Sequence, residues 1–223
     1  SVHQHTASDG LGSLTLSKAF EKGTKYDPSK NRTTNYMINP ISGATIQFSL
    51  KKQAFSETTT DKEVILDLWN GVEQTNWHNS LEVTGNYGRL TLELSGGKAH
   101  ASTETPVLYL TLQSGAYGIV NQPICVSTYN AAALANNTWT HHTVTIKSKD
   151  QKLYVRYFQD GLLNSASVFD TNTNIEEIPG KIDGYIGALQ TAPSGATYSG
   201  QSMQGAGKLS GSMDELRYWK KDL

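Results

Sequence analysis

The chain of 223 residues contains one cysteine, Cys125, so it cannot form an internal disulfide. The single cysteine favours a reducing site of synthesis. No apolar run approaches the roughly 18 residues that cross a bilayer, so we expect no membrane insertion. The sequence begins SVHQHTASDG, without the basic segment and apolar core of a signal peptide.

The charge balance excludes another class of partner. Nineteen Lys and Arg against twenty Asp and Glu leave a formal net charge of −1. Proteins that bind nucleic acid neutralise phosphates with a surplus of basic residues, and this chain has no such surplus. We therefore predict no nucleic-acid partner.

The composition favours β structure. Gly, Ser, Thr and Asn make up about a third of the residues, which is typical of turns and polar strands. No segment longer than about ten residues has helical apolar spacing, and residues 131–135 are the one short helix candidate. The length suits one all-β domain, since such domains commonly reach about 200–250 residues.

A period of two runs through most of the chain from residue 44 onward. Pro123 places its strand at a sheet edge or a bulge. About a dozen short strands in one domain predict a two-sheet antiparallel β-sandwich, or jelly roll. The predicted strands are 44–50, 64–69, 80–83, 88–94, 107–112, 118–128, 139–148, 151–158, 185–189 and 209–219.

The first 43 residues have a different pattern. Short apolar alternations at 14–16 and 36–38 flank a polar stretch, which predicts an N-terminal arm with short edge strands. The jelly-roll domain then covers 44–223. Two interpretations of the arm stay open: a loosely ordered tail, or an arm that docks on an identical subunit or within a capsid or tail assembly.

The second half of the chain carries motifs that resemble a known family. Residues 139–146 read WTHHTVTI, residues 153–155 read LYV, and Asp160-Gly161 follows as a turn. Residues 185–187 (YIG) and 209–219 (LSGSMDELRYW) match the closing strands of the same signature. Residues 139–219 thus resemble the laminin G-like, concanavalin A-like jelly rolls, whose fold serves many functions.

This resemblance gives several residues an expected role. The predicted strands 139–148 and 151–158 form the clearest hairpin of the sequence, and the resemblance implies that Trp139 covers one sheet at its entry. Gly211 is expected to permit a close backbone approach or a bulge where the last strand bends. The resemblance also implies a structural Ca²⁺ at Asp214. Asp183 and Asp9 are further candidate ligands by residue type alone, and the resemblance does not place them. The alternative is that Asp214 accepts hydrogen bonds from neighbouring backbone N–H groups.

The sequence offers little for catalysis. Retaining glycosidases need two carboxyl groups about 5.5 Å apart on one face of the site. Glu63 and Asp67 share strand parity, but their spacing is too long for such a pair. Cys125 lies in an apolar strand and is predicted to be a core residue. We therefore predict a chain that is not an enzyme, with a diverged polysaccharide-active enzyme as a remaining alternative.

The loop 71–79 is the richest candidate for ligand binding. Sugar recognition combines an exposed aromatic ring with amide and carboxylate groups, and this loop offers both kinds. Tyr117 in the turn 114–117 is a second aromatic candidate, whereas Trp69 and Trp219 lie in strands and are predicted to be core. The proposed ligand-binding residues are Glu73, Asn76, Trp77, His78, Asn79 and Tyr117.

Three functional hypotheses follow from these patterns. The first is a non-catalytic recognition or adhesion module that binds a glycan or a protein surface through jelly-roll loops. The second is a structural component of a larger assembly, such as a virion decoration or tail-associated protein. The third is the diverged enzyme. The first two predict an extracellular, cell-surface or virion-associated protein.

Overall fold

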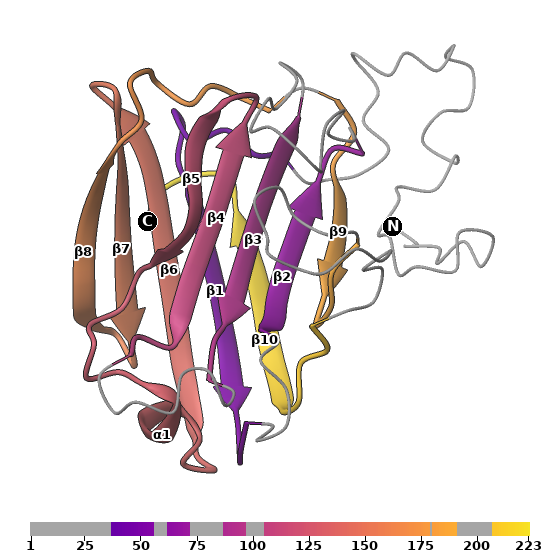
Figure 1. Cartoon of the computed structure of the whole chain (residues 1–223), viewed down its shortest axis with the longest axis vertical. Coiled ribbons are helices and arrows are strands. Elements are labelled where there is room, and N and C mark those ends of the chain that lie inside the picture. The colour runs from indigo at the N-terminus through magenta and orange to yellow at the C-terminus, as the bar shows by residue number, and fades with distance from the viewer. Residues whose placement is uncertain (1–36, 56–61, 72–86, 97–104, 179, 191–206) are drawn as a thin grey trace, which may run out of the picture.

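The computed structural model describes residues 37–55, 62–71, 87–96, 105–178, 180–190 and 207–223. They form two antiparallel five-stranded sheets, which face each other in Figure 1. This arrangement confirms the predicted jelly-roll sandwich. No helix among these residues has the length and apolar character to cross a bilayer.

Sheet A has the strand order β10-β1-β6-β7-β8. Its central hairpin is the one predicted from the sequence, and its two-residue turn, Asp150-Gln151, has positive φ at both positions, as the right-handed twist of a hairpin favours. A second tight turn at Asp160-Gly161 leads into the edge strand. The strands are β1 (Ala44–Lys51), β6 (Trp139–Lys149), β7 (Lys152–Gln159), β8 (Leu162–Asp170) and β10 (Ser212–Trp219).

Sheet B has the order β5-β4-β3-β2-β9 and lies in front of sheet A in Figure 1. Strand β5, which contains Pro123, is an edge strand as predicted, but it ends at Pro123 and does not reach residue 128. The one helix of the described ranges, α1 (Ala131–Leu134), occupies the predicted alanine-rich segment, and the Asn130 side chain caps it. The strands are β2 (Glu63–Trp69), β3 (Gly88–Leu94), β4 (Leu108–Ser114), β5 (Tyr117–Pro123) and β9 (Asp183–Ile186).

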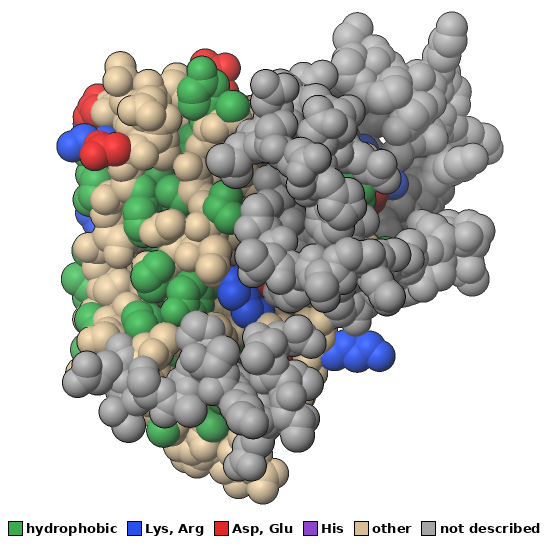
Figure 2. All heavy atoms as spheres, viewed as in Figure 1, with side chains coloured by type: hydrophobic (Ala, Val, Ile, Leu, Met, Phe, Trp, Pro, Cys, Tyr) green, Lys and Arg blue, Asp and Glu red, His purple; other side chains and the backbone are tan. Residues whose placement is uncertain are grey.

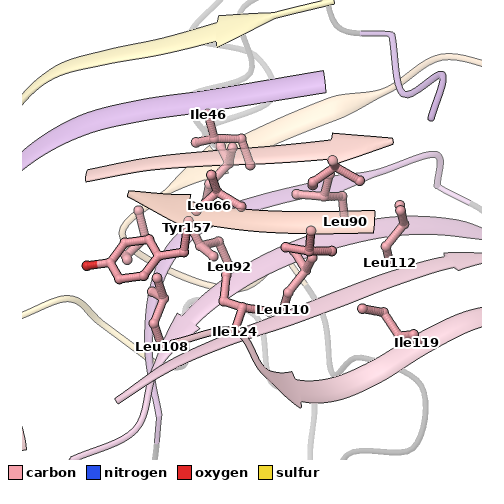
Figure 3. Close-up of a cluster of buried hydrophobic side chains, with 14 of the residues drawn as sticks. Ile46, Leu66, Leu90, Leu92, Leu108, Leu110, Leu112, Ile119, Ile124 and Tyr157 are labelled. Carbon is pink, nitrogen blue, oxygen red and sulfur yellow. The ribbon is translucent and has the colours of Figure 1, made fainter. Parts of the chain in front are cut away.

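The hydrophobic core fills the space between the sheets. Figure 3 shows Ile46 and Tyr157 of sheet A with leucines of β2, β3 and β4 from sheet B. Cys125 is buried and belongs to this cluster, as predicted. The alternation of apolar residues along each strand directs one face of each sheet into the core.

The part of the predicted arm that is described packs against the sandwich. Residues 37–43 form no strand, but Ile38 is fully buried in the core and its carbonyl accepts a hydrogen bond from the Ile178 N–H. The alternation predicted at 14–16 lies outside the described residues. The division of the chain at residue 43 stays a prediction.

Two tryptophans predicted to be core residues lie instead on the outer faces of the sheets. Trp219 is 40% exposed, and its indole N–H donates to the Gln47 side chain. Trp69 is half-buried and lies opposite Arg89, whose guanidinium is 5.6 Å from the indole ring centre. In β10 a bulge at Glu215, with φ of 53°, helps set which side chains face outward.

Candidate functional site

An open pocket lies where β1 ends and where β6 and β10 begin. Its volume is about 380 Å³, which falls within the range of small-ligand sites. The lining is mostly amide, hydroxyl and backbone groups, with one charged side chain, Lys51. The lining residues are Lys51, Gln53, Ala54, Asn137, Ser210, Gly211 and Ser212.

Two special backbone positions shape this pocket. Asn137 has φ of 60°, and its N–H donates to the Lys52 carbonyl at 2.8 Å. A Cβ atom at Gly211 would lie 3.0 Å from the Lys51 carbonyl oxygen, so glycine lets the two segments approach closely. This agrees with the close backbone approach expected at Gly211.

The side chains of three adjacent strands form a row beside the pocket. Lys51 lies opposite Trp139 on β6 and opposite Ser212 on β10. Directly opposed residues of antiparallel strands project to the same face, with Cβ atoms about 4.5–5.5 Å apart. Because Leu50 faces the core, Lys51 and this whole row face outward.

Trp139 is therefore a surface residue beside Lys51, which lines the pocket. Its side chain is 52% exposed. The resemblance predicted that Trp139 covers one sheet, and it does lie on the outer face of sheet A. However, its ring leaves a large aromatic surface open to solvent, which makes Trp139 available to a ligand.

A buried ion pair fixes the wall behind the pocket. Lys52 is fully buried, and its ammonium lies 2.8 and 2.7 Å from the two Glu63 oxygens and 2.7 Å from the Ser210 carbonyl oxygen. The Ser210 N–H donates back to Glu63 at 2.9 Å. Lys52 is neutralised in this way, so Lys51 gives the pocket its positive charge.

A second ion pair lies on the outer face of sheet B. Both side chains of the Asp67–Arg89 pair are fully buried, and the guanidinium donates to the two carboxylate oxygens at 2.8 and 2.6 Å. Thr91 and the backbone N–H of Gln190 also donate to the carboxylate. These four donors satisfy the hydrogen-bonding capacity of the buried carboxylate.

The expected shared parity of Glu63 and Asp67 is wrong. Ile65 is an extra residue in β2, a bulge, because Val64 pairs with Glu93 whereas Leu66 pairs with Leu92. Glu63, the first residue of β2, therefore lies on the core-facing side, and Asp67 lies on the outer face. Each carboxylate has a cation as its partner, and the two do not form a catalytic pair.

A third buried carboxylate, Glu93, lies beside Lys62. Burial raises the pKa of Glu93, and the Lys62 ammonium at 3.5 Å partly offsets this effect. The Lys62 ammonium also donates to the Asn121 side chain. Glu93 thus completes a set of three carboxylates among the described residues that each lie beside a cation.

Most of the sequence-predicted binding residues lie outside the described part of the chain. These are Glu73, Asn76, Trp77, His78 and Asn79. Tyr117 is described, and it is 51% exposed where the β4–β5 hairpin turns. Tyr117 belongs to sheet B and does not line the pocket of sheet A.

The pocket was not predicted from the sequence, although one signal was present. The alternation of residues 44–50 extends to Lys51 and predicts that its side chain faces outward. The next residue, Lys52, points to the other face and is buried. The remaining lining residues come from segments near 53, 137 and 211, which only the sheet pairing brings together. No local pattern marks such a meeting.

Asp214 is exposed on the outer face of sheet A. One carboxylate oxygen accepts a hydrogen bond from the Glu215 N–H at 2.7 Å, which is the interaction named as the alternative to calcium. Asp183 lies in sheet B and pairs with Lys181 at 2.9 Å, and Asp9 is outside the described residues. Within the described ranges, no three acidic, histidine or cysteine side chains group as metal ligands.

Calcium binding at Asp214 stays a prediction with a direct test. A ligand that binds only the folded state raises the melting temperature. If Asp214 holds calcium together with backbone carbonyls, added Ca²⁺ stabilises the wild type, and this gain disappears in Asp214→Asn. Thermal melts with calcium and with a chelator measure it, and identical curves for the wild type remove Asp214 as a ligand.

No family model matches the sequence, and no curated protein matches it. Solved structures of similar fold include mouse laminin alpha1 domains LG4-5, at 13% identity and a TM-score of 0.44. That likeness covers 86% of this chain and 40% of the laminin chain, so this chain spans less than half of its length.

Two structures of a Ruminococcus gnavus sialidase module, CBM40, are also similar. The one bound to α2,6-sialyllactose has 14% identity and a TM-score of 0.39, and the likeness covers 95% of this chain and 91% of that one. The one bound to α2,3-sialyllactose has 13% identity and a TM-score of 0.40, with coverage of 82% and 78%. These proteins are concanavalin A-like jelly rolls, and this chain resembles them in its fold.

Proposed function

We propose that the chain is a non-catalytic recognition module that binds a glycan in the pocket beside Trp139. The observation that carries this proposal is the juxtaposition of an exposed indole with a polar pocket of about 380 Å³. A sugar ring offers C–H groups to an aromatic face and hydroxyls to amides and hydroxyls, and this rim presents both.

The charge of the pocket favours an acidic glycan. Lys51 is the single charged residue among the described residues that line it. The neighbouring Lys52 is buried against Glu63 and presents no ammonium to a ligand. An exposed ammonium attracts a carboxylate or sulfate through an interaction that salt weakens. A sialylated or sulfated sugar is therefore expected to bind more tightly than its neutral counterpart.

The test is a glycan array followed by calorimetry with the best acidic ligand, and sialyllactose is one of the probes. Trp139→Ala is expected to weaken binding at least tenfold, about 1.4 kcal/mol, because the aromatic platform is lost. Trp219→Ala is the matched control, since it removes an exposed indole from the same sheet away from the pocket. Lys51→Gln is expected to remove the salt dependence.

Three outcomes separate this proposal from its competitors. If Trp77→Ala abolishes binding while Trp139→Ala does not, the loop 71–79 is the site and the pocket is not. If no sugar binds the wild type, the recognition proposal fails. Release of reducing ends from a polysaccharide would replace it with the enzyme hypothesis.

A further inference from the structure

Each sheet of the sandwich has two edge strands, and three of these four edges are protected against pairing with another chain. In the order of the described strands, the edges are β10 and β8 in sheet A, and β5 and β9 in sheet B. Natural sheets protect edges with charges, prolines, bulges or short strands. Strand β10 has a bulge at Glu215 and exposed charges, β5 has Pro123 and a bulge, and β9 has four residues.

Strand β8 differs from these edges. It is nine residues long, and from Leu162 to Phe169 it contains no charged residue, proline or glycine. Three of its large apolar side chains are exposed, Leu162 by 76%, Leu163 by 58% and Val168 by 53%, whereas Phe169 is partly buried against the core. In Figure 2 charged side chains gather at the upper left corner, and mostly hydrophobic and uncharged ones follow the margin below it, where Figure 1 places β8.

Only the first part of this edge is irregular. Asn164 is a bulged residue, because Phe158 pairs with Leu163 whereas Tyr157 pairs with Ser165. Near it, the Val126 N–H donates to the Asn164 side chain and the Ser165 hydroxyl donates to the Ile124 carbonyl. From Ala166 to Asp170 the strand is regular, and one in two of its residues directs its backbone N–H and C=O away from β7.

We propose that two copies of this chain pair through residues 166–170 of β8, antiparallel about a two-fold axis at Val168. The two copies of sheet A then form one continuous ten-stranded sheet. Such an interface is isologous and closes at the dimer. It satisfies the edge backbone groups with hydrogen bonds and buries the exposed Val168 side chains against each other.

The side chains on the outer face fit this register. Val168 lies opposite Tyr154 on β7, so the centre of the interface is a row of two valines flanked by two tyrosines. Ala166 lies opposite the exposed Arg156, and Asp170 lies opposite Lys152, with charged groups 3.9 Å apart. With Val168 opposite its own copy, Asp170 of the second copy faces Ala166.

This register also provides charge complementarity. The Asp170 carboxylate of the second copy lies between its own Lys152 and Arg156 of the first copy. The short Ala166 side chain leaves space for the arginine to reach across one strand. Because the two-fold axis repeats the arrangement, two such charge pairs flank the central valines.

The dimer lies away from the proposed glycan site. The pocket is formed at β1, β6 and β10, and β10 is the opposite edge of sheet A from β8. Both pockets of a dimer stay open, so two weak sites act on one multivalent glycan surface. This dimer contact is different from the assembly through residues 1–43 that the sequence suggested.

Sedimentation velocity over a concentration series tests the pairing. The wild type is expected to shift from the chain mass of 24.3 kDa toward twice that mass. Val168→Lys places a charge at the centre of the edge and is expected to stay monomeric at every concentration. Ile186→Lys is the matched control, because it charges an exposed apolar residue on β9, an edge strand of sheet B. This variant is expected to remain dimeric.

A cysteine pair tests the register independently of affinity. Residues at position 168 face each other across the axis, within the Cα separation of about 4.4–6.8 Å that a disulfide spans. Val168→Cys is expected to form a covalent dimer under mild oxidation, whereas Ala166→Cys is not, because its two copies lie four residues apart in register. A monomeric wild type, a dimeric Val168→Lys or equal cross-linking at both positions overturns the proposal. The affinity of the chain for a monovalent sugar depends on the pocket alone, so it tests the proposed function independently of dimer formation.

Discussion

Arg89→Met is expected to lower the free energy of unfolding by about 3–5 kcal/mol, the usual cost of removing one partner of a buried ion pair. The guanidinium is fully buried and makes two short contacts with Asp67, which is also fully buried. Methionine fills much of the same volume, so the loss arises from an uncompensated carboxylate. Urea denaturation of the wild type and variant, followed by tryptophan fluorescence, measures it.

Two further variants show whether charge is the cause. Arg217→Met removes an exposed arginine whose partner Glu215 is also exposed, and it is expected to change stability by less than about 0.5 kcal/mol. Asp67→Leu combined with Arg89→Met removes both charges and is expected to recover much of the loss. If the double variant is as unstable as the sum of the single ones, the pairing explanation is wrong.

The same ion pair shows where sequence reasoning about this fold succeeds and where it ends. The hairpin of β6 and β7 was predicted because a period of two and a turn are local properties of the chain. The extra residue Ile65 in β2 cannot be recognised from the residue types around it. Because of it, Glu63 and Asp67 lie on opposite faces of the sheet. A bulge depends on the partner strand, so counting parity along one strand cannot detect it.

The tryptophans illustrate a similar limit for the candidate site. Trp219 and Trp139 lie in strands whose alternate faces are both partly apolar, so periodicity does not tell which face is the core. The pairing of β1 with both strands settles the question, because Lys51 and Gln47 lie on the outer face with them. The pocket depends on these long-range pairings, which explains why the sequence indicated a binding module but not this site.

His142 introduces a titratable group into the core itself. Its ring is stacked on Phe48, with centroids 4.7 Å apart, and Nδ1 is 2.8 Å from the Tyr157 hydroxyl oxygen. The residue is 1% exposed, and Nε2 is buried without a hydrogen-bond partner. Burial lowers the pKa of His142 to about 4; Asp160 acts in the opposite direction, and His141 lowers the pKa further.

The fold is therefore expected to lose about 3 kcal/mol through His142 as the pH falls from neutrality to 4. The unfolded chain binds a proton at the ordinary histidine pKa of about 6.5, whereas the folded chain resists it until about pH 4. The contribution of neutral His142 to folding stability is complete above the pKa of the unfolded chain and declines as the pH falls below that pKa. In His142→Phe, which keeps the stacking on Phe48, this part of the pH dependence is expected to vanish. Denaturation at a series of pH values measures the difference between the two proteins, so titrating carboxylates common to both cancel. An NMR titration of His142 with a midpoint near 6.5 would contradict this account.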